Sequence, residues 1–357
     1  MTKILTGDSE YEELKQYITD NQINRLMIVG NAALKIGKIS DFLCSLTENG
    51  TETVTFSGYT PNPTYEEVMA GVCLLQNAQC GAVLAIGGGS AMDVAKCIRL
   101  YSGMERSKLI VIPTTSGTGS EATRFAVIYR DGEKKSVEDE CCLPDVVLYD
   151  EALPATLPLY HKKAGLLDTL CHAIESYWSV NSDEESREYA RQAISMVMDN
   201  VTGYLEGNPQ ETIKMMKAGF LGGKAINISK TTAGHAMCYK MTTLYGIAHG
   251  HSAALCVMKL WPYMKEHTED CIDTRGEEFL MQRLAELDKL VIYGDKCGAE
   301  ALTELVNSLN LPKPTHFTEK DTDILADAVN PERLSNNPVR LGKETIKDLY
   351  SDINTYT

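Results

Sequence analysis

The sequence has few basic residues for its size. Only 34 of its 357 residues are Lys or Arg, against 49 Asp and Glu, and the net charge at pH 7 is −15 with neutral histidines. This balance disfavours a nucleic-acid-binding protein, which needs a basic face to neutralise phosphates. Any anionic ligand therefore has to be held by a local pocket of cationic or N–H donor groups.

Long apolar runs are also absent. No uninterrupted apolar segment reaches 18 residues, and the first residues lack the apolar core of a secretion signal. The eleven cysteines form no C-x-x-C pair, and their number is odd. Reduced, buried thiols are favoured over a disulfide framework. We therefore expect no membrane association and a reducing, cytoplasmic location.

The residues that are present divide the chain into two parts. Its length suits about two domains. β-Branched runs alternate with helical segments over residues 1–158, which predicts an α/β domain with a parallel sheet. Strand signals nearly vanish over residues 159–357, where long amphipathic runs predict an all-α domain.

The expected elements of the first domain follow from apolar periodicity and turn residues. Helices are predicted at 11–20 and 65–78. A hairpin of strands 125–130 and 134–137 is expected to add to the sheet. The strands expected to form the sheet itself are 25–30, 53–57, 82–86, 108–112 and 146–149.

A triple glycine, Gly87-Gly88-Gly89, stands with Ser90 between a predicted strand and a predicted helix. Without Cβ atoms the backbone N–H groups can approach an anion, and the helix dipole favours negative charge there. Ser90 is also a good N-cap, so an ordinary strand-to-helix turn is the alternative. The motif is not the G-x-G-x-x-G fingerprint, and by itself it leaves phosphate binding open.

A second polar loop, from Pro113 to Glu121, follows the next predicted strand and is rich in hydroxyl groups. Two donor-rich loops after neighbouring strands fit a ligand crevice at the carboxyl edge of a parallel sheet. Hydroxyls without a nearby basic catalyst suit ribose and pyrophosphate better than nucleophilic catalysis. The pair of loops therefore favours nucleotide binding of a Rossmann-like kind.

Histidines form the other distinctive pattern. Asp168 and His172 are four residues apart on a predicted helix, so both can contact one metal ion. Alone, this spacing would favour a simple ion pair, but His235, His249 and His251 follow in small, apolar surroundings. A carboxylate with several imidazoles suits iron, zinc or manganese, which can act as a Lewis acid on a carbonyl or alkoxide oxygen.

The order of these motifs, from about residue 26 to residue 254, resembles the iron-dependent (group III) alcohol dehydrogenases. His249 follows His235 by 14 residues, which is the spacing of that family's last two metal ligands. The other residues that carry the resemblance are Pro61 to Thr64, Gly87 to Ser90 with Asp93 and Lys96, Pro113 to Thr115 with Gly117, Thr118 and Glu121, Ala164 to Asp168, and His172 to Glu175.

The resemblance implies an NAD(P)-binding α/β domain, a helical metal-binding domain like that of dehydroquinate synthase, and an active site between them. It implies hydride transfer from NAD(P)H to a small aldehyde. The implied metal is iron(II), although zinc would accept the same ligands. The implied ligands are Asp168, His172, His235 and His249. The implied cofactor residues are Asn31, Gly87, Gly88, Gly89, Ser90, Asp93, Thr114, Thr115 and Thr118.

Two positions depart from the family pattern. Many relatives carry a proton-relaying histidine four residues after the third ligand, where this chain has Tyr239. Tyr239 and the nearby His251 are therefore the candidate catalytic residues. NAD-preferring members often have an Asp after the first strand, where this chain has Asn31. NADH and NADPH consequently both remain open as the reductant.

Three segments, Ser229 to His235, Tyr245 to Ser252 and Arg333 to Val339, resemble the phosphonoacetaldehyde reductase branch, which forms 2-hydroxyethylphosphonate. Lys230, Arg333 and Asn336 are the expected phosphonate-binding residues, because a dianion in an acidic protein needs fixed donors. The alternative for Lys230 and Arg333 is that they are ordinary solvated surface charges.

Other functions remain as alternatives. One is a general short-chain alcohol, lactaldehyde or glycerol-type dehydrogenase of the same superfamily. A more distant one is a lyase like dehydroquinate synthase, which also joins an NAD domain to a helical metal domain. A metal- and nucleotide-binding scaffold without activity is the non-enzymatic alternative. The expected partner is a small-molecule aldehyde or alcohol. The sequence leaves the oligomeric state open, although homodimers are common in such families.

Overall fold

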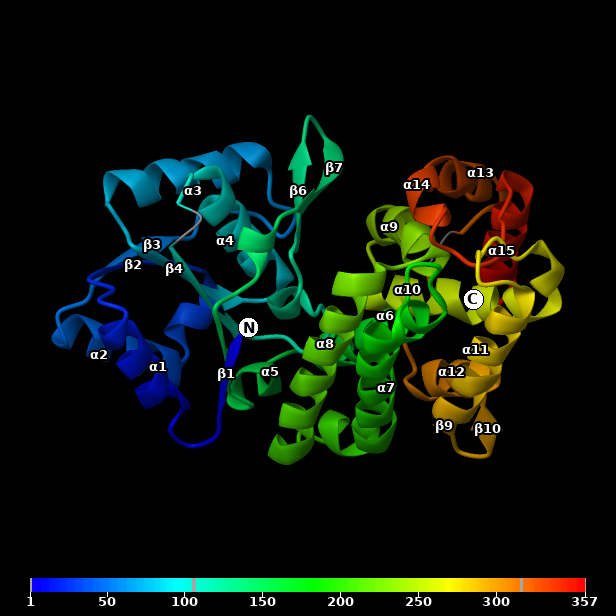
Figure 1. Ribbon diagram of the computed structural model, residues 1–357, viewed down its shortest axis with the longest axis horizontal. Coiled ribbons are helices and arrows are strands. Elements are labelled where there is room, and N and C mark those ends of the chain that lie inside the picture. Colours follow the sequence, from blue (N-terminus) through cyan, green and yellow to red (C-terminus); the bar gives the residue numbers. More distant parts are fainter. Residues whose placement is uncertain (1, 105–106, 315–316, 357) are drawn as a thin grey trace. The chain divides into compact units, whose positions relative to one another are not determined.

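The computed structural model of the protein describes residues 2–104, 107–314 and 317–356 (Figure 1). The chain divides into two compact units, and the division falls between Leu157 and Pro158. This division lies one residue before the boundary expected from the sequence. The first unit contains a parallel sheet with helices and the second is helical, which confirms the predicted fold class.

The first unit is built on a six-stranded sheet of order β1-β8-β5-β4-β2-β3, and all its pairings are parallel. Every residue of β4 and β8 is buried, as expected for strands covered on both faces. The strands are β1 (Lys3–Thr6), β2 (Arg25–Gly30), β3 (Glu52–Phe56), β4 (Ala82–Gly87), β5 (Lys108–Pro113) and β8 (Val146–Tyr149).

Helices cover both faces of this sheet (Figure 1). One face packs against α1 and α2 through a cluster that includes Leu14, Phe42 and Leu84. The apolar stripe predicted over 65–78 is the buried side of α3, which begins with a capping box between Thr64 and Glu67. The helices are α1 (Glu10–Asp20), α2 (Gly37–Glu48), α3 (Tyr65–Asn77), α4 (Gly89–Tyr101) and α5 (Ala152–Ala155).

The hairpin prediction is wrong in one respect. β6 (Phe125–Arg130) and β7 (Glu133–Glu138) do pair antiparallel, but they form a separate two-stranded sheet. The edge beside β8 is taken by β1, a four-residue strand that the sequence analysis did not predict. β7 has the sequence EKKSVE with no buried residue, so it gains little from joining a covered sheet.

The second unit is a helical bundle around α6. Fifteen of the 20 residues of α6 are buried, which marks it as the central helix. The Trp178 ring packs edge-on against Trp261 at 5.7 Å between ring centroids. The elements are α6 (Leu159–Trp178), α7 (Glu184–Leu205), α8 (Pro209–Ser229), α9 (Ala233–Tyr245), α10 (His249–Glu266), α11 (Glu277–Leu290), β9 (Ile292–Tyr293), β10 (Lys296–Cys297), α12 (Gly298–Ser308), α13 (Glu319–Asp327), α14 (Pro331–Leu334) and α15 (Lys343–Tyr356).

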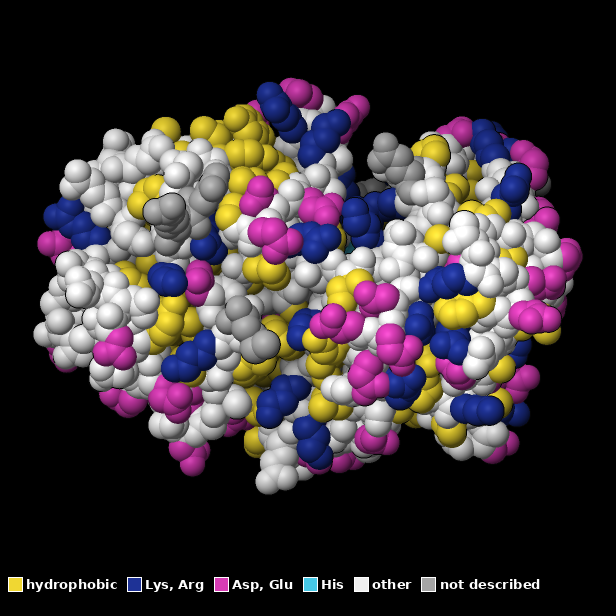
Figure 2. All heavy atoms as spheres, in the orientation of Figure 1, with side chains coloured by type: hydrophobic (Ala, Val, Ile, Leu, Met, Phe, Trp, Pro, Cys, Tyr) yellow, Lys and Arg dark blue, Asp and Glu magenta, His cyan; other side chains and the backbone are white. Residues whose placement is uncertain are grey.

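The surface and the thiols agree with the composition. On the face seen in Figure 2, basic and acidic side chains are interspersed. All eleven cysteines are free thiols, as predicted. Among the described residues, no helix combines the length and the apolar character needed to cross a membrane.

Candidate metal centre and nucleotide-binding loops

The two glycine- and hydroxyl-rich loops begin side by side at the carboxyl ends of β4 and β5. These strands are neighbours in the sheet, and the Thr114 N–H donates to the Gly87 carbonyl at 3.0 Å. A Cβ on Gly88 would lie 3.1 Å from the Thr115 Cγ2, so the loops are packed against each other. Parallel strands thus bring the predicted nucleotide-binding residues of both loops together at one sheet edge.

The structure corrects the role of Ser90. α4 begins at Gly89 with Gly88 as its N-cap, so Ser90 lies inside the first turn. The Ser90 hydroxyl donates to the Pro61 carbonyl at 2.5 Å and ties the Pro61-Asn62-Pro63 segment to the glycine turn. Gly88 and Gly89 have no Cβ atoms, so an anion such as a pyrophosphate can come close to the backbone N–H groups at the start of α4.

Asp93 supports the second loop from α4. One carboxylate oxygen accepts a hydrogen bond from the Ser120 hydroxyl at 2.9 Å, and the other accepts from the Val127 N–H at 3.1 Å. Both oxygens are therefore used within the protein. Asp93 therefore shapes the second loop.

Lys96, one turn further along α4, is fully buried. Its ammonium group donates to the carbonyls of Ser120, Thr123 and Phe125 at 2.6, 2.9 and 2.7 Å. Lys96 had no expected role beyond its part in the family resemblance. No local signal marks this lysine, because the groups that it binds lie 24 to 29 positions further along the chain.

Asn31 and Thr118 complete this edge of the sheet. Asn31 follows β2, whose last residue Gly30 pairs with Ile86 of β4. Thr118 lies against the glycine turn, because its Cγ2 would be 3.4 Å from a Cβ on Gly89. The exposed Asn31 side chain is thus beside the loop that is predicted to bind the cofactor.

The predicted metal ligands converge within the second unit. Oδ1 of Asp168 on α6 lies 3.4 Å from Nε2 of His235, in the first turn of α9, and 3.9 Å from Nε2 of His249, the first residue of α10. One donor atom from each of these three side chains lies within 4.8 Å of the other two. This separation allows one cation to contact all three donors.

His172 joins this group from the same helix as Asp168. Its Nε2 lies 3.8 Å from Oδ1 of Asp168, and its ring stacks on His235 with 4.4 Å between ring centroids. The spacing of four residues therefore places both side chains on one face of α6, as predicted. All four residues implied by the resemblance lie together.

Gly250 makes the approach of α10 to α6 feasible. A Cβ at this position would lie 2.0 Å from the carbonyl oxygen of Ala164 and 2.6 Å from Cβ of Asp168. Only glycine permits such a close contact between helices. In the sequence, Gly250 stands directly after His249, but nothing local indicates this contact between helices.

The electrostatics of the cluster suit a bound cation. Burial raises the pKa of the Asp168 carboxyl, but the neighbouring imidazoles outweigh burial and hold this pKa well below its ordinary value. Burial opposes protonation of His235, yet Glu175 and Asp168 raise its pKa to about 9. A carboxylate and imidazole nitrogens are ligands for iron, zinc and manganese, so the residues fit the implied metal.

Tyr239 and Arg333 lie beside this cluster. The Tyr239 ring stacks on His249 with 5.3 Å between ring centroids. An Nη1 group of Arg333 donates to the Tyr239 hydroxyl at 2.9 Å, and the guanidinium lies 5.0 Å from the centre of the same ring. Burial raises the pKa of Tyr239 above its ordinary value, so its hydroxyl is neutral. Tyr239 therefore contacts both Arg333 and the predicted metal ligand His249.

The structure does not bring His251 to the cluster. Its donor atoms are not among those that converge near Asp168. Instead its buried ring contacts Tyr160, with Nδ1 3.4 Å from the hydroxyl oxygen. Burial lowers the pKa of His251 to about 4. Two residues along a helix turn a side chain by more than half a circle, which explains why His251 and His249 point apart.

The structure does not support the predicted phosphonate-binding role of Asn336 and Lys230. Asn336 is buried, and its amide donates to the carbonyls of Ser229 and Thr231 at 2.9 Å each. Its Oδ1 accepts from the Ser179 hydroxyl at 2.8 Å. Asn336 therefore holds the segment that leads into α9. Lys230 is exposed at the end of α8, with φ of 61°.

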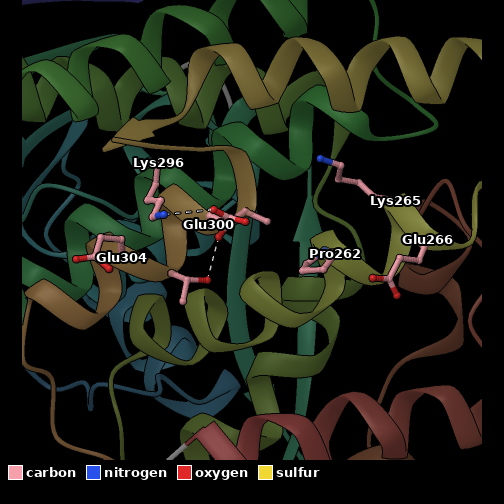
Figure 3. A pocket seen from close by; sticks show the side chains of 8 residues that line it. Pro262, Lys265, Glu266, Lys296, Glu300 and Glu304 are labelled. Atoms are coloured by element: carbon pink, nitrogen blue, oxygen red, sulfur yellow. Dashed lines mark hydrogen bonds and ion pairs between the residues drawn. The ribbon is translucent and has the colours of Figure 1, made fainter. Parts of the chain in front are cut away.

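A separate surface pocket lies between the end of α10 and α12 (Figure 3). Lys296 and Glu300 line it and form an ion pair at 3.9 Å, and Lys265 borders the same hollow. None of the predicted site residues lines this pocket. Its lining residues are separate from the metal cluster, so this pocket has no part in the site.

Comparison with known families covers nearly the whole chain. Residues 1–151 match the family described as iron-containing alcohol dehydrogenase. Residues 163–354 match the C-terminal part of the Fe-containing alcohol dehydrogenase family. The two matches correspond to the α/β unit and to the helical unit that holds the metal cluster.

Individual relatives agree with this result. Alcohol dehydrogenase 4 of Schizosaccharomyces pombe is 31% identical over 95% of this chain and 84% of its own length. The NADPH-dependent butanol dehydrogenase of Clostridium saccharobutylicum is 25% identical over 97% of this chain and 95% of its own length.

A sulfoacetaldehyde reductase from Bifidobacterium kashiwanohense, solved in complex with NAD+, shares the fold. Its TM-score is 0.86 at 24% identity, over 100% of this chain and 98% of that one. The family match, the full-length relatives and the shared fold support one conclusion. The chain belongs to the iron-containing alcohol dehydrogenase family, and it is an oxidoreductase that acts on CH–OH groups.

Proposed function

We propose that this enzyme reduces phosphonoacetaldehyde to 2-hydroxyethylphosphonate with NAD(P)H. The observation that carries the substrate class is the position of Arg333, whose guanidinium contacts the tyrosine that stacks on His249. A guanidinium beside the metal cluster can hold an anionic group by charge-assisted hydrogen bonds while the aldehyde group faces the metal ligands.

In this proposal, residues of the helical unit bind the metal and the substrate, and residues of the α/β unit bind the cofactor. Asp168, His172, His235 and His249 hold a divalent metal, iron(II) or zinc. When bound, the metal supplies Lewis acidity toward the carbonyl oxygen. Arg333 binds and orients the phosphonate, and the neutral Tyr239 hydroxyl holds the guanidinium in place. The glycine turn and the threonines of the second loop bind the pyrophosphate and ribose of NAD(P)H.

Replacing Arg333 with alanine tests the substrate class. Loss of a hydrogen bond to a charged group costs about 1.5–3 kcal/mol, or roughly 10–100-fold in binding. We therefore expect KM for phosphonoacetaldehyde to rise at least about tenfold, and KM for propanal to change less than about threefold. Steady-state kinetics with both aldehydes, and with sulfoacetaldehyde and butanal for comparison, measure this difference.

The control for this experiment is Arg340→Ala, which removes an exposed arginine outside the cluster. It should leave both KM values unchanged. Equal losses with phosphonoacetaldehyde and propanal in the Arg333 variant would contradict the proposal. A general alcohol dehydrogenase is the second candidate, favoured by the full-length similarity to yeast and butanol dehydrogenases. It is supported if the wild-type enzyme has its highest kcat/KM with butanal or propanal.

Cofactor preference is expected to depend on Asn31. A carboxylate at the end of β2 would repel the 2′-phosphate of NADPH, and Asn31 imposes no such repulsion. We expect Asn31→Asp to lower the ratio of kcat/KM for NADPH to that for NADH by about tenfold, which corresponds to about 1.4 kcal/mol. The exposed Asn49, at the end of α2, provides the matched control Asn49→Asp. An unchanged ratio would mean that the ribose is bound elsewhere.

A further inference from the structure

Glu175 is a buried carboxylate on α6 that none of the assigned roles uses. It lies seven residues after Asp168 on the same helix, which is close to two helical turns and thus the same side of α6. Its side chain is inaccessible to solvent, and Oε2 contacts Nδ1 of His235. Glu175 therefore contacts one nitrogen of the His235 ring, Nδ1, whereas Asp168 lies near the other nitrogen, Nε2.

The other oxygen of Glu175 has a fixed set of donors. Oε1 accepts hydrogen bonds from the Thr232 N–H at 2.9 Å, from the Thr232 hydroxyl at 2.7 Å and from the His235 N–H at 3.1 Å. These N–H groups belong to the start of α9, where a negative charge is favoured. Because three donors point at Oε1, the carboxylate cannot rotate without losing them. Oε2 is thus held against the imidazole.

This arrangement determines which nitrogen of His235 carries a proton. An ionised carboxylate only accepts hydrogen bonds, so Nδ1 has to donate to Oε2. Once Nε2 has lost its own proton, as a metal ligand must, the ring presents a lone pair on Nε2, the nitrogen that faces Oδ1 of Asp168 at 3.4 Å. We propose that Glu175 is a positioning residue, which fixes the tautomer and the ring orientation of His235 for metal binding. This inference rests on the metal site of the proposed function.

Glu175→Gln separates this role from that of a simple helix cap. The glutamine oxygen can still accept from Thr232 and from the His235 N–H, so the start of α9 keeps its hydrogen bonds. The amide nitrogen then faces Nδ1 and donates to it. Nδ1 becomes the acceptor, the ring proton moves to Nε2, and Nε2 can no longer bind a metal. Replacing an orienting carboxylate by its amide is known to trap the wrong tautomer in this way.

The test measures metal binding directly. The wild-type protein and the variant are stripped of metal with a chelator and titrated with Co²⁺ in competition with a chromophoric chelator. We expect Glu175→Gln to weaken Co²⁺ binding by about 10–100-fold and to change the visible absorption of the bound Co²⁺. The Tm of the metal-free variant and its affinity for NADPH should match those of the wild-type protein.

Glu286→Gln is the matched control. Glu286 on α11 accepts a hydrogen bond from the Tyr177 hydroxyl of α6 at 2.7 Å and has no contact with the cluster among those described. Its Co²⁺ affinity and spectrum should equal those of the wild-type protein. Glu175→Asp, which keeps the charge but withdraws it by one methylene, should retain the spectrum better than the glutamine variant if the tautomer is what matters.

Two outcomes would overturn the inference, and they are distinguishable. Wild-type Co²⁺ affinity and spectrum in Glu175→Gln would show that Glu175 only caps α9. Failure of the wild-type protein itself to bind one Co²⁺ would reject the metal site, and with it the proposed function. A protein that binds Co²⁺ normally but does not reduce phosphonoacetaldehyde would reject the substrate while leaving the role of Glu175 intact.

Discussion

Replacing Asp168 with asparagine is expected to reduce kcat/KM for aldehyde reduction by about 1,000-fold or more. Oδ1 of Asp168 lies within 4 Å of a nitrogen of each of the three imidazoles, so it is the common neighbour of the whole cluster. An amide is neutral and a poor ligand, so the cation loses both charge compensation and one donor. Lewis-acid stabilisation supplies several kcal/mol to the transition state, and each 1.36 kcal/mol corresponds to a factor of ten.

Three measurements on Asp168→Asn check this expectation: metal content by elemental analysis, steady-state kinetics, and NADPH binding by fluorescence. Metal and activity should be lost together, while NADPH binding should remain because its predicted residues are in the other unit. Asp199→Asn changes an exposed aspartate on α7 and should affect none of the three. Full metal occupancy together with wild-type activity in Asp168→Asn would remove this carboxylate from the ligand set.

Lys96→Met is expected to have the largest effect on stability. The substitution leaves the carbonyls of Ser120, Thr123 and Phe125 without their charged donor inside the protein. Removing one partner of a buried charged network costs about 3–5 kcal/mol, and each unsatisfied buried acceptor costs about 1–3 kcal/mol. We expect the free energy of unfolding of the α/β unit to fall by about 3 kcal/mol or more.

The same substitution should weaken NADPH binding, because the Lys96 ammonium holds the loop that carries Thr118. Urea denaturation followed by circular dichroism, and limited proteolysis at residues 114–130, measure the two effects. Lys135→Met, at an exposed lysine of β7, should change the free energy of unfolding by less than about 0.5 kcal/mol. If Lys96→Met resists protease and urea as the wild-type protein does, the loop has another anchor.

The sequence was sufficient to predict elements whose signal is local. β4 and β8 are continuous apolar runs, β2 and β5 are apolar after their first residue, and α3 has an apolar stripe. Burial and periodicity therefore predict these elements directly. β1 was missed because four residues carry too little pattern, and its partner β8 is about 140 residues away in the chain. The hairpin was assigned to the wrong sheet for the same reason: strand order depends on distant pairings.

The candidate site shows a similar division. Asp168 and His172 could be paired from their spacing, whereas the contacts of Glu175 with His235 join residues 60 positions apart. Asn336 was predicted to bind the phosphonate, and only its contacts with Ser229 and Thr231 show that it is a buried scaffold residue. Residue type and spacing predict which side chains can bind a metal, but orienting and supporting residues follow from packing.

The tight packing at Gly250 has a practical consequence for engineering. A methyl group there would overlap the Ala164 carbonyl and push α10 away from α6, and His249 would move with it. A directed-evolution library that aims to broaden the aldehydes accepted by this enzyme should therefore keep codon 250 fixed. The library should instead vary codons such as 333, where a change of side chain leaves the separation of α6 and α10 unchanged.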